Sequence, residues 1–202
     1  MEDVGAPVEV VPRPMRADAR RNYDRLVTAA AAAFTEHGLD APLDDIARRA
    51  GVGAGTLYRH FANREALMEA VYGAQVESVC SRAATLAATQ PPAEALTLWL
   101  RDLVAHISAK RGLAAAIMAG GGDTSPAFAA CKTALRDAAG SLLDRAQAAG
   151  AVRPDLTLDD LLRLMHGVAV SSEYSPDGPE RLITFVIDGL RRFPADPAPS
   201  AG

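Results

Sequence analysis

Cysteines, aromatic side chains and long apolar runs are all scarce in this sequence of 202 residues. Neither Cys80 nor Cys131 lies in a CxxC or Cys/His pattern, so the sequence predicts neither a disulfide framework nor a zinc or other metal site. We expect two buried thiols in helices. No run approaches the roughly 18 apolar residues of a membrane span, and residues 1–4 lack the basic and apolar regions of a signal peptide. We therefore expect a soluble, cytoplasmic protein.

Paired catalytic groups are also missing. The four histidines are scattered, and no nucleophile stands beside a base. The run Gly120–Gly122 follows no predicted strand and precedes no Lys-Ser/Thr, so it lacks the context of a phosphate-binding loop. We expect a surface loop there, no enzyme activity and no cofactor. An enzyme with an all-helical pocket is the alternative, and an assay of hydrolysis separates the two.

Arginine is concentrated near the N-terminus although the net charge of the chain is −4. Residues 1–12 carry three acids and no base, whereas residues 13–72 carry nine arginines and eight acids. The start of this second segment has only Asp18 and Asp24 to oppose Arg13, Arg16, Arg20, Arg21 and Arg25. Such an arm beside a DNA-binding unit can follow phosphates, and a solvated terminus is the alternative interpretation.

Alanine supplies much of the apolar content, and it has the lowest cost of any residue in a helix. Residues 1–19 contain three prolines and no periodicity, which predicts a flexible arm. After this arm, apolar residues recur at helical spacing and predict helices over residues 20–37, 43–50, 54–61 and 64–88. Gly38 and Gly51 follow the first two helices as stop signals, and Asn63 suits the N-cap of the fourth.

A clear break at Gln90–Pro92 separates these helices from the rest of the chain. Beyond it, the same periodicity predicts helices over residues 93–108, 111–119, 126–149, 155–172 and 179–193. No segment alternates convincingly as a strand does, and the Pro/Ala-rich tail 194–202 is expected to be disordered. The predicted fold class is all-α, with about nine helices.

The second and third predicted helices have the size and spacing of a helix-turn-helix. Gly51 can take positive φ in the turn, and Ala47 is small where the two helices approach. Leu57 and Phe61 are then core residues, as is Phe34 in the first helix. The outward positions are expected to face a DNA groove, with two glycines allowing close backbone approach: they are Gly53, Ala54, Gly55, Thr56, Tyr58, Arg59 and His60, with Arg64 nearby. A partly packed aromatic, a solvated charge and a helix cap are the alternatives for Tyr58, Arg59 and His60.

Residues 21–75 resemble the TetR family of bacterial transcriptional regulators. The resemblance rests on Asp45–Val52, Thr56–Phe61 and Arg64–Leu67. It implies that Ala54, Gly55, Thr56 and Arg59 contact bases in the major groove, whereas Tyr58, His60 and Arg64 hold phosphates. Ala41-Pro42 stands where the family places a capping Ser or Thr, so that hydroxyl contact is lost. Asp40 is a possible substitute cap, although its carboxylate would repel phosphate.

The resemblance also implies a helical effector and dimerisation domain, whose last two helices pair with those of a second copy. Two apolar stripes are compatible with this, and intramolecular core is an equally good interpretation of either: Leu161, Leu164, Met165 and Val168, then Leu182, Phe185, Val186, Gly189 and Leu190. The expected effector pocket is lined by Trp99, Leu103, His106, Ile107, Met118, Phe128, Leu135 and Met165, each of which alone also fits a core position. The low aromatic content favours a small, apolar effector.

These inferences combine into one functional prediction. Residues 1–19 form an arm, 20–75 a DNA-binding domain, 76–193 the effector and dimerisation domain, and 194–202 a tail. The chain is expected to be a homodimeric repressor that binds a palindromic DNA operator and leaves it when a small molecule binds. A regulator of the same family without a small-molecule effector is the alternative.

Overall fold

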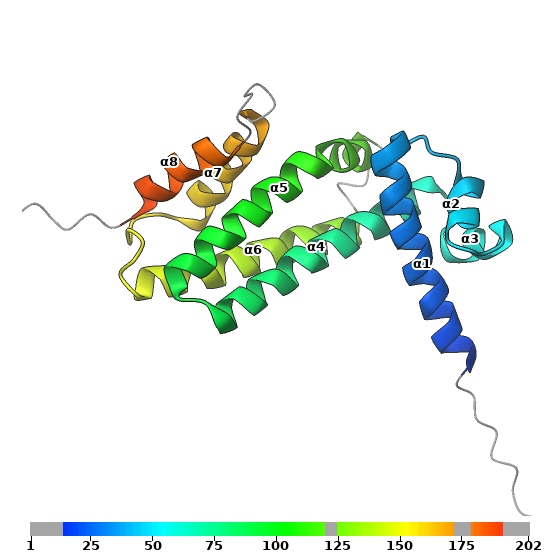
Figure 1. Cartoon of the computed structure of the whole chain (residues 1–202), viewed down its shortest axis with the longest axis horizontal. Helices are drawn as coiled ribbons and strands as arrows, with labels where there is room; N and C mark the ends of the chain where they lie inside the picture. The colour runs from blue at the N-terminus through cyan, green and yellow to red at the C-terminus, as the bar shows by residue number, and fades with distance from the viewer. Residues whose placement is uncertain (1–13, 120–124, 172–178, 192–202) are drawn as a thin grey trace, which may run out of the picture. The chain divides into compact units, whose positions relative to one another are not determined.

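The structure is a computed structural model that describes residues 14–119, 125–171 and 179–191. These residues form eight helices and no strand (Figure 1), which confirms the all-α class. The helices are α1 (Pro14–His37), α2 (Leu43–Arg49), α3 (Ala54–His60), α4 (Arg64–Thr89), α5 (Pro92–Ala119), α6 (Pro126–Ala148), α7 (Leu158–Ser171) and α8 (Glu180–Leu190). The expected arm over residues 1–13, the loop Gly120–Gly122 and the tail 194–202 lie outside the described residues.

The first helix begins at Pro14, six residues before the predicted start. Proline suits the first position of a helix because it needs no amide partner there and its φ is already helical. The residues that follow, Met15-Arg16-Ala17, are good helix formers. The prediction of a flexible arm is therefore wrong for residues 14–19.

Two further boundaries differ from the predicted ones. A single helix, α5, replaces the two predicted over residues 93–108 and 111–119. Gly112 costs only about 1 kcal/mol in a helix interior, and the alanine- and leucine-rich flanks tolerate that cost. The seventh helix begins at Leu158, three residues after Asp155, because Thr157 caps it by accepting a hydrogen bond from the amide of Asp160 at 3.1 Å.

The chain divides into two compact units, residues 1–67 and 68–202. This boundary and the predicted one after residue 75 both fall inside α4. In the first unit α1 packs on α2 and α2 packs on α3. The buried side chains that join them are Leu26, Ala30, Ala33, Phe34, Ile46, Ala47, Leu57 and Phe61.

The second unit is built around α5, which packs against α6, α7 and α8. Trp99 is fully buried in its core, and the indole Nε1 donates to the carbonyl of Val79 on α4 at 3.0 Å. Cys80 and Cys131 are half-buried rather than buried, and burial raises the pKa of both thiols. Over the described ranges, no helix is both long and apolar enough to cross a membrane.

Candidate nucleic-acid interface

The turn between α2 and α3 is built from backbone hydrogen bonds around one glycine. The amide of Gly51 donates to the carbonyl of Arg48, and the amide of Val52 donates to the carbonyl of Ala47, both at 3.0 Å. These two bonds form a Schellman motif, which places its glycine in the left-handed region. Gly51 has φ +66°, so the positive φ expected from the sequence is confirmed. Ala47 is 1% exposed where the two helices meet.

The third helix has a buried side and an exposed side. Leu57 is 1% exposed and Phe61, directly after the helix, is 3% exposed, which confirms both as core residues. On the other side Tyr58 is 52% exposed and Arg59 is also exposed, while Thr56 and His60 are half-exposed. The unit therefore presents hydroxyl, guanidinium and aromatic groups on one short helix.

The start of α3 leaves its backbone open to a partner. Gly53, Ala54 and Gly55 are all exposed. A Cβ atom added at either glycine would meet no described atom within 4 Å. Because this space is empty, a large partner such as a DNA groove can approach the backbone of α3 closely.

Arg59 is already oriented by its own helix. Its Nε donates to the carbonyl of Gly55 at 3.2 Å, and its Nη2 donates to Oγ1 of Thr56 at 3.0 Å. These contacts hold the guanidinium along the N-terminal half of α3, beside the open glycines. A guanidinium in this position can pair with a base edge or a phosphate with little loss of side-chain freedom.

Arg64 has a structural contact that sequence analysis missed. Its Nη1 donates to the carbonyls of Leu39 and Ala41, at 2.6 and 2.7 Å. It therefore ties the start of α4 to the loop between α1 and α2. A charged side chain 25 positions from its partner leaves no signal in local sequence, so only the folded chain reveals the bond.

The helix starts in this unit differ in their capping. Asn63 accepts a hydrogen bond from the amide of Ala66 at 2.8 Å, which confirms it as the cap of α4. The N-cap residue of α2 is Pro42, and no described side chain forms a capping hydrogen bond at this helix start. The suggestion that Asp40 replaces the family's hydroxyl is therefore wrong, because the prolyl residue sits in the cap position itself and leaves Asp40 two residues too early.

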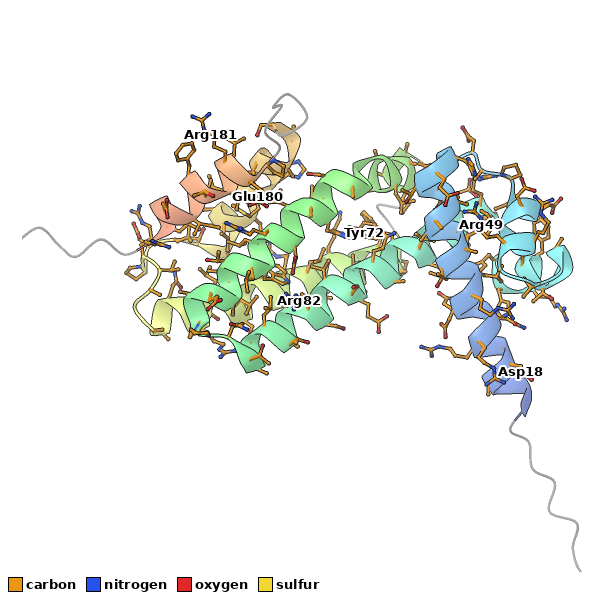
Figure 2. The ribbon with its side chains drawn as sticks, in the orientation of Figure 1. Asp18, Arg49, Tyr72, Arg82, Glu180 and Arg181 are labelled. Carbon is orange, nitrogen blue, oxygen red and sulfur yellow. The ribbon has the colours of Figure 1, made fainter. Side chains whose placement is uncertain are left out.

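An ion pair joins α1 to α2. Arg49, which is labelled in Figure 2, donates from Nη2 to Glu36 Oε2 at 2.7 Å. The hydrogen bond from Arg49 holds the pKa of the Glu36 carboxyl below its ordinary value.

On α1 itself, Arg20 pairs with Asp24 at 3.5 Å and Arg21 pairs with Asp18. Two of the basic-arm arginines are therefore partly neutralised by acids on the same helix.

Two residues of α1 contact the turn and the far end of α3: Tyr23, which sequence analysis did not single out, and Arg25, which it placed in the basic arm. Arg25 donates from Nη2 to the carbonyl of Gly51 at 3.2 Å. The ring of Tyr23 lies 5.2 Å from that of Phe61 and 6.1 Å from that of His60, centroid to centroid. The apolar periodicity of α1 gave no sign of these contacts because both side chains lie off its buried face.

The residues expected around an effector pocket are partly brought together in the second unit. Trp99, Leu103 and Met165 belong to one buried core cluster, against which Ile107 and Leu135 pack. The other three lie outside this cluster. His106 is half-buried, Phe128 is buried and Met118 is 47% exposed.

Tyr72 joins two of these residues and was missed by sequence analysis. Its ring centroid lies 6.1 Å from that of His106 on α5 and 5.0 Å from that of Phe128 on α6. Burial raises the pKa of the Tyr72 hydroxyl. One turn along α4, the buried Oε1 of Gln75 finds no hydrogen-bond partner among the described residues. A buried acceptor of this kind is uncommon in a folded protein.

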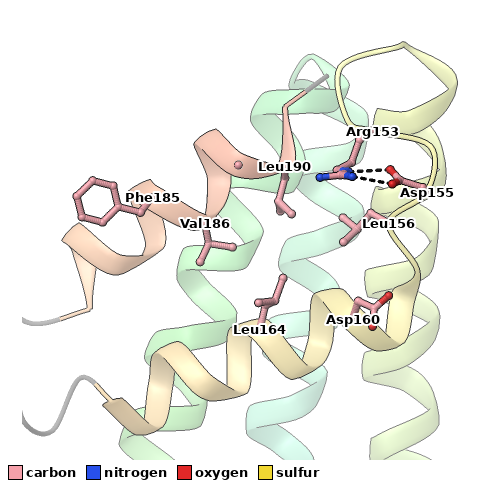
Figure 3. A pocket seen from close by; sticks show the side chains of 9 residues that line it. Arg153, Asp155, Leu156, Asp160, Leu164, Phe185, Val186 and Leu190 are labelled. Carbon is pink, nitrogen blue, oxygen red and sulfur yellow. Dashed lines mark hydrogen bonds and ion pairs between the residues drawn. The ribbon is translucent and has the colours of Figure 1, made fainter. Parts of the chain in front are cut away.

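The two predicted apolar stripes divide differently between core and surface. On α7, Leu161, Met165 and Val168 are buried and Leu164 is 43% exposed. On α8, Leu190 is buried, whereas Phe185 is 61% exposed. A groove of about 390 Å³ lies beside them. Figure 3 shows its lining side chains, with the ion pair of Arg153 and Asp155 at one end. Its lining residues are Arg153, Asp155, Leu156, Asp160, Leu164, Phe185, Val186, Gly189 and Leu190.

Comparisons with known proteins agree over both units. Residues 26–71 match the model of bacterial regulatory proteins of the tetR family, and residues 91–192 match the C-terminal domain of SbtR-like transcriptional regulators. Two solved TetR regulators are similar over most of the chain. One from Streptomyces coelicolor is 40% identical, with a TM-score of 0.72, over 85% of this chain and 99% of that one. One from Mycobacterium vanbaalenii is 40% identical, with a TM-score of 0.73, over 89% and 100%.

Shorter similarities concern the DNA-binding end. The A-factor receptor protein of Streptomyces griseus is 38% identical over 65 residues, which span 32% of this chain and 24% of that protein. The regulator TtgW of Pseudomonas putida is 40% identical over 60 residues, 29% of this chain and 45% of that protein. The chain therefore matches less than half the length of these two relatives. Both family models match this chain, and two solved TetR regulators are similar over most of it. Together with a helix-turn-helix whose third helix is exposed, these matches show that the chain is a DNA-binding transcriptional regulator of the TetR family and not an enzyme.

Proposed function

We propose that the protein is a repressor that recognises a palindromic operator with α3. The main support for DNA recognition is the exposed side of α3. There Arg59 is hydrogen-bonded to Thr56, next to glycines whose backbone is open to a partner. Gly53, Ala54, Gly55, Thr56 and Arg59 then face base edges. Tyr58 and His60 face the phosphates. Arg64 adds positive charge near the DNA phosphates, while its Nη1 holds the loop before α2.

We propose further that two copies pair through α7 and α8, so that two recognition helices fit half-sites about 34 Å apart. Phe185 and Leu164 leave large apolar area exposed beside a groove that carries three more apolar side chains, Leu156, Val186 and Leu190. A twofold contact is self-complementary, so each Phe185 meets the same surface of the other copy. Burying both faces stabilises the pair through the hydrophobic effect.

The second unit, residues 68–202, is proposed to bind a small, mainly apolar effector. Tyr72, His106 and Phe128 supply aromatic rings, and Oε1 of Gln75, which has no partner among the described residues, supplies an acceptor. An effector with one donor group would satisfy that oxygen, whose desolvation is otherwise uncompensated. The effector favours a dimer with the wrong spacing of α3 and so releases DNA by differential affinity. The proposed location is the cytoplasm, where the operator is.

The DNA proposal is tested by selection from a random duplex library, followed by binding measurements on the enriched sequence. Arg59→Ala should weaken binding by roughly 1–3 kcal/mol, the usual worth of a good base contact. Arg82→Ala is the matched control, since it removes an exposed, ion-paired arginine from the second unit. Equal binding by Arg59→Ala and Arg82→Ala, or enrichment of no sequence by the intact protein, would refute the proposal.

A further inference from the structure

The recognition helix is too short to fix its own orientation. It has seven residues, no described side chain caps its start at Gly53, and Leu57 is its one buried residue. Isolated helices shorter than about 12–15 residues are marginal in water. Its main packing partner is α2, itself seven residues long. The ends of α3 must therefore be held by something beyond the helix-turn-helix.

One of these ends is held at the turn by Arg25. The guanidinium of Arg25 crosses from α1 and donates to the carbonyl of Gly51 at 3.2 Å. The same nitrogen lies 2.4 Å from the position that a Cβ on Gly51 would take. The side chain therefore rests on the bare face of the glycine, and this contact exists only because residue 51 has no side chain.

The other end is held by Tyr23. Its ring packs tilted against Phe61 at 5.2 Å and edge-on against His60 at 6.1 Å. His60 is the last residue of α3, and Phe61 follows it in extended conformation. Edge-on and offset pairs at these separations are favourable beyond the area they bury. A ring anchored on α1 thus fixes where α3 ends.

Both residues lie in α1 just before residue 26, where the match to the family's DNA-binding model begins. We propose that Tyr23 and Arg25 are positioning residues, which set the angle of α3 and so the precision with which it fits its operator. This inference rests on the proposed DNA recognition by α3. It assigns to the N-terminal part of α1 the role of a brace for the recognition helix rather than that of a phosphate-binding arm.

The order of α3 is tested first, without DNA, by amide hydrogen exchange on the full chain. In Tyr23→Ala and Arg25→Ala, the amides of Leu57 and Phe61 should exchange roughly three- to tenfold faster, the fold-change expected for loss of one such contact. The amide of Ala50, bonded to Ile46 at 2.9 Å, reports on α2 and should change less than about twofold. Tyr23→Phe keeps the ring and should behave as the parent protein.

A matched control separates this effect from a general effect of charge or stability. Arg20→Ala removes an arginine of the same helix that forms an exposed ion pair with Asp24. It should leave exchange in α3 unchanged. Two results would overturn the proposal. One is that Tyr23→Ala and Arg25→Ala accelerate amide exchange in α2 as much as in α3, and the other is that neither variant accelerates amide exchange in α3.

Sequence discrimination is tested next, with the duplex enriched by the intact protein and a scrambled duplex of equal length. Tyr23→Ala and Arg25→Ala should lower the affinity ratio of the two duplexes roughly three- to tenfold, because each loosens α3 by one such contact. The slope of log K against log salt should not change, since no phosphate contact is lost. A slope reduced by about 0.9 per variant would instead assign a phosphate contact to that residue and overturn its role as a brace. If the intact protein enriches no sequence, DNA recognition fails as a proposal, while the exchange measurement still decides whether α1 orders α3.

Discussion

Substitution of Gly51 by alanine is the sharpest test of how the turn between α2 and α3 is built. Gly51 has φ +66°, where an L-residue with a Cβ costs roughly 1–2 kcal/mol. The new Cβ would also lie 2.4 Å from Nη2 of Arg25. That nitrogen is the end of a flexible, exposed side chain, so it swings away and loses its bond to the Gly51 carbonyl rather than clashing.

The loss of this hydrogen bond adds roughly 0.5–1 kcal/mol, the lower part of the range for a net contribution, because the bond is exposed. Gly51→Ala should therefore destabilise the first unit by about 1.5–3 kcal/mol. Gly38 offers a matched control, since it has φ +77° and a Cβ there would meet no described atom within 4 Å. Gly38→Ala should cost only the backbone part, about 1–2 kcal/mol.

The assay is urea unfolding at 25 °C, followed by circular dichroism, with the midpoint and slope fitted for the first transition. The double variant Gly51→Ala with Arg25→Ala completes a cycle, and the coupling should equal the difference between Gly51→Ala and Gly38→Ala. Equal costs at Gly51 and Gly38 would show that the Arg25 contact contributes nothing. A cost below about 0.5 kcal/mol at both positions would refute the argument from backbone conformation as well.

Four further predictions address the interface, the pair of helices α7 and α8, and the core. Gly55→Ala should stabilise the free protein by up to about 1 kcal/mol, since alanine is the better helix residue and the added Cβ meets no described atom. The same change should weaken binding to the enriched duplex, because it places a methyl group against the DNA groove. Phe185→Glu should convert the proposed dimer to a monomer in sedimentation velocity, and an unchanged dimer would contradict pairing through α8. Trp99→Phe should cost roughly 1–3 kcal/mol in urea unfolding, because the indole hydrogen bond to the Val79 carbonyl is lost and the smaller ring leaves a cavity in the core. Because the pKa of Glu36 is lowered in the folded protein, this carboxylate stabilises the fold at pH values above its ordinary pKa of 4.5, and the contribution is lost as pH falls through the folded-state pKa. Arg49→Ala should therefore raise the pKa of Glu36 in a carboxyl NMR titration and weaken the dependence of the unfolding free energy on acid pH.

Local signals in the sequence predicted the features of the first unit that depend on neighbouring residues. The stop at Gly51 follows from the backbone hydrogen bonds of a helix end, and the cap at Asn63 follows from the unpaired amides of a helix start. Leu57 and Phe61 were identified as core because their spacing places them on the buried face of a short helix. Each of these inferences needs only a few consecutive residues, and each agrees with the structure.

Boundaries set by weak preferences were predicted less well. The start of α1 at Pro14 and the continuity of α5 through Gly112 depend on costs of about 1 kcal/mol or less, which neighbouring residues outweigh. The apolar stripe of α7 was ambiguous for a different reason. Periodicity identifies an apolar face, but it does not say whether that face meets another helix of the same chain or a second copy.

The helical class, the helix-turn-helix and the exposed residues of α3 could all be predicted from the sequence, because they depend on local conformation and periodicity. How α3 is held could be read only from the folded chain. Arg25 meets Gly51 across 26 positions, and Arg64 meets Leu39 across 25. Such contacts involve flexible side chains and ordinary backbone carbonyls, which carry no sequence signature. They form only when packing of Leu26, Ile46 and Leu57 brings distant segments together.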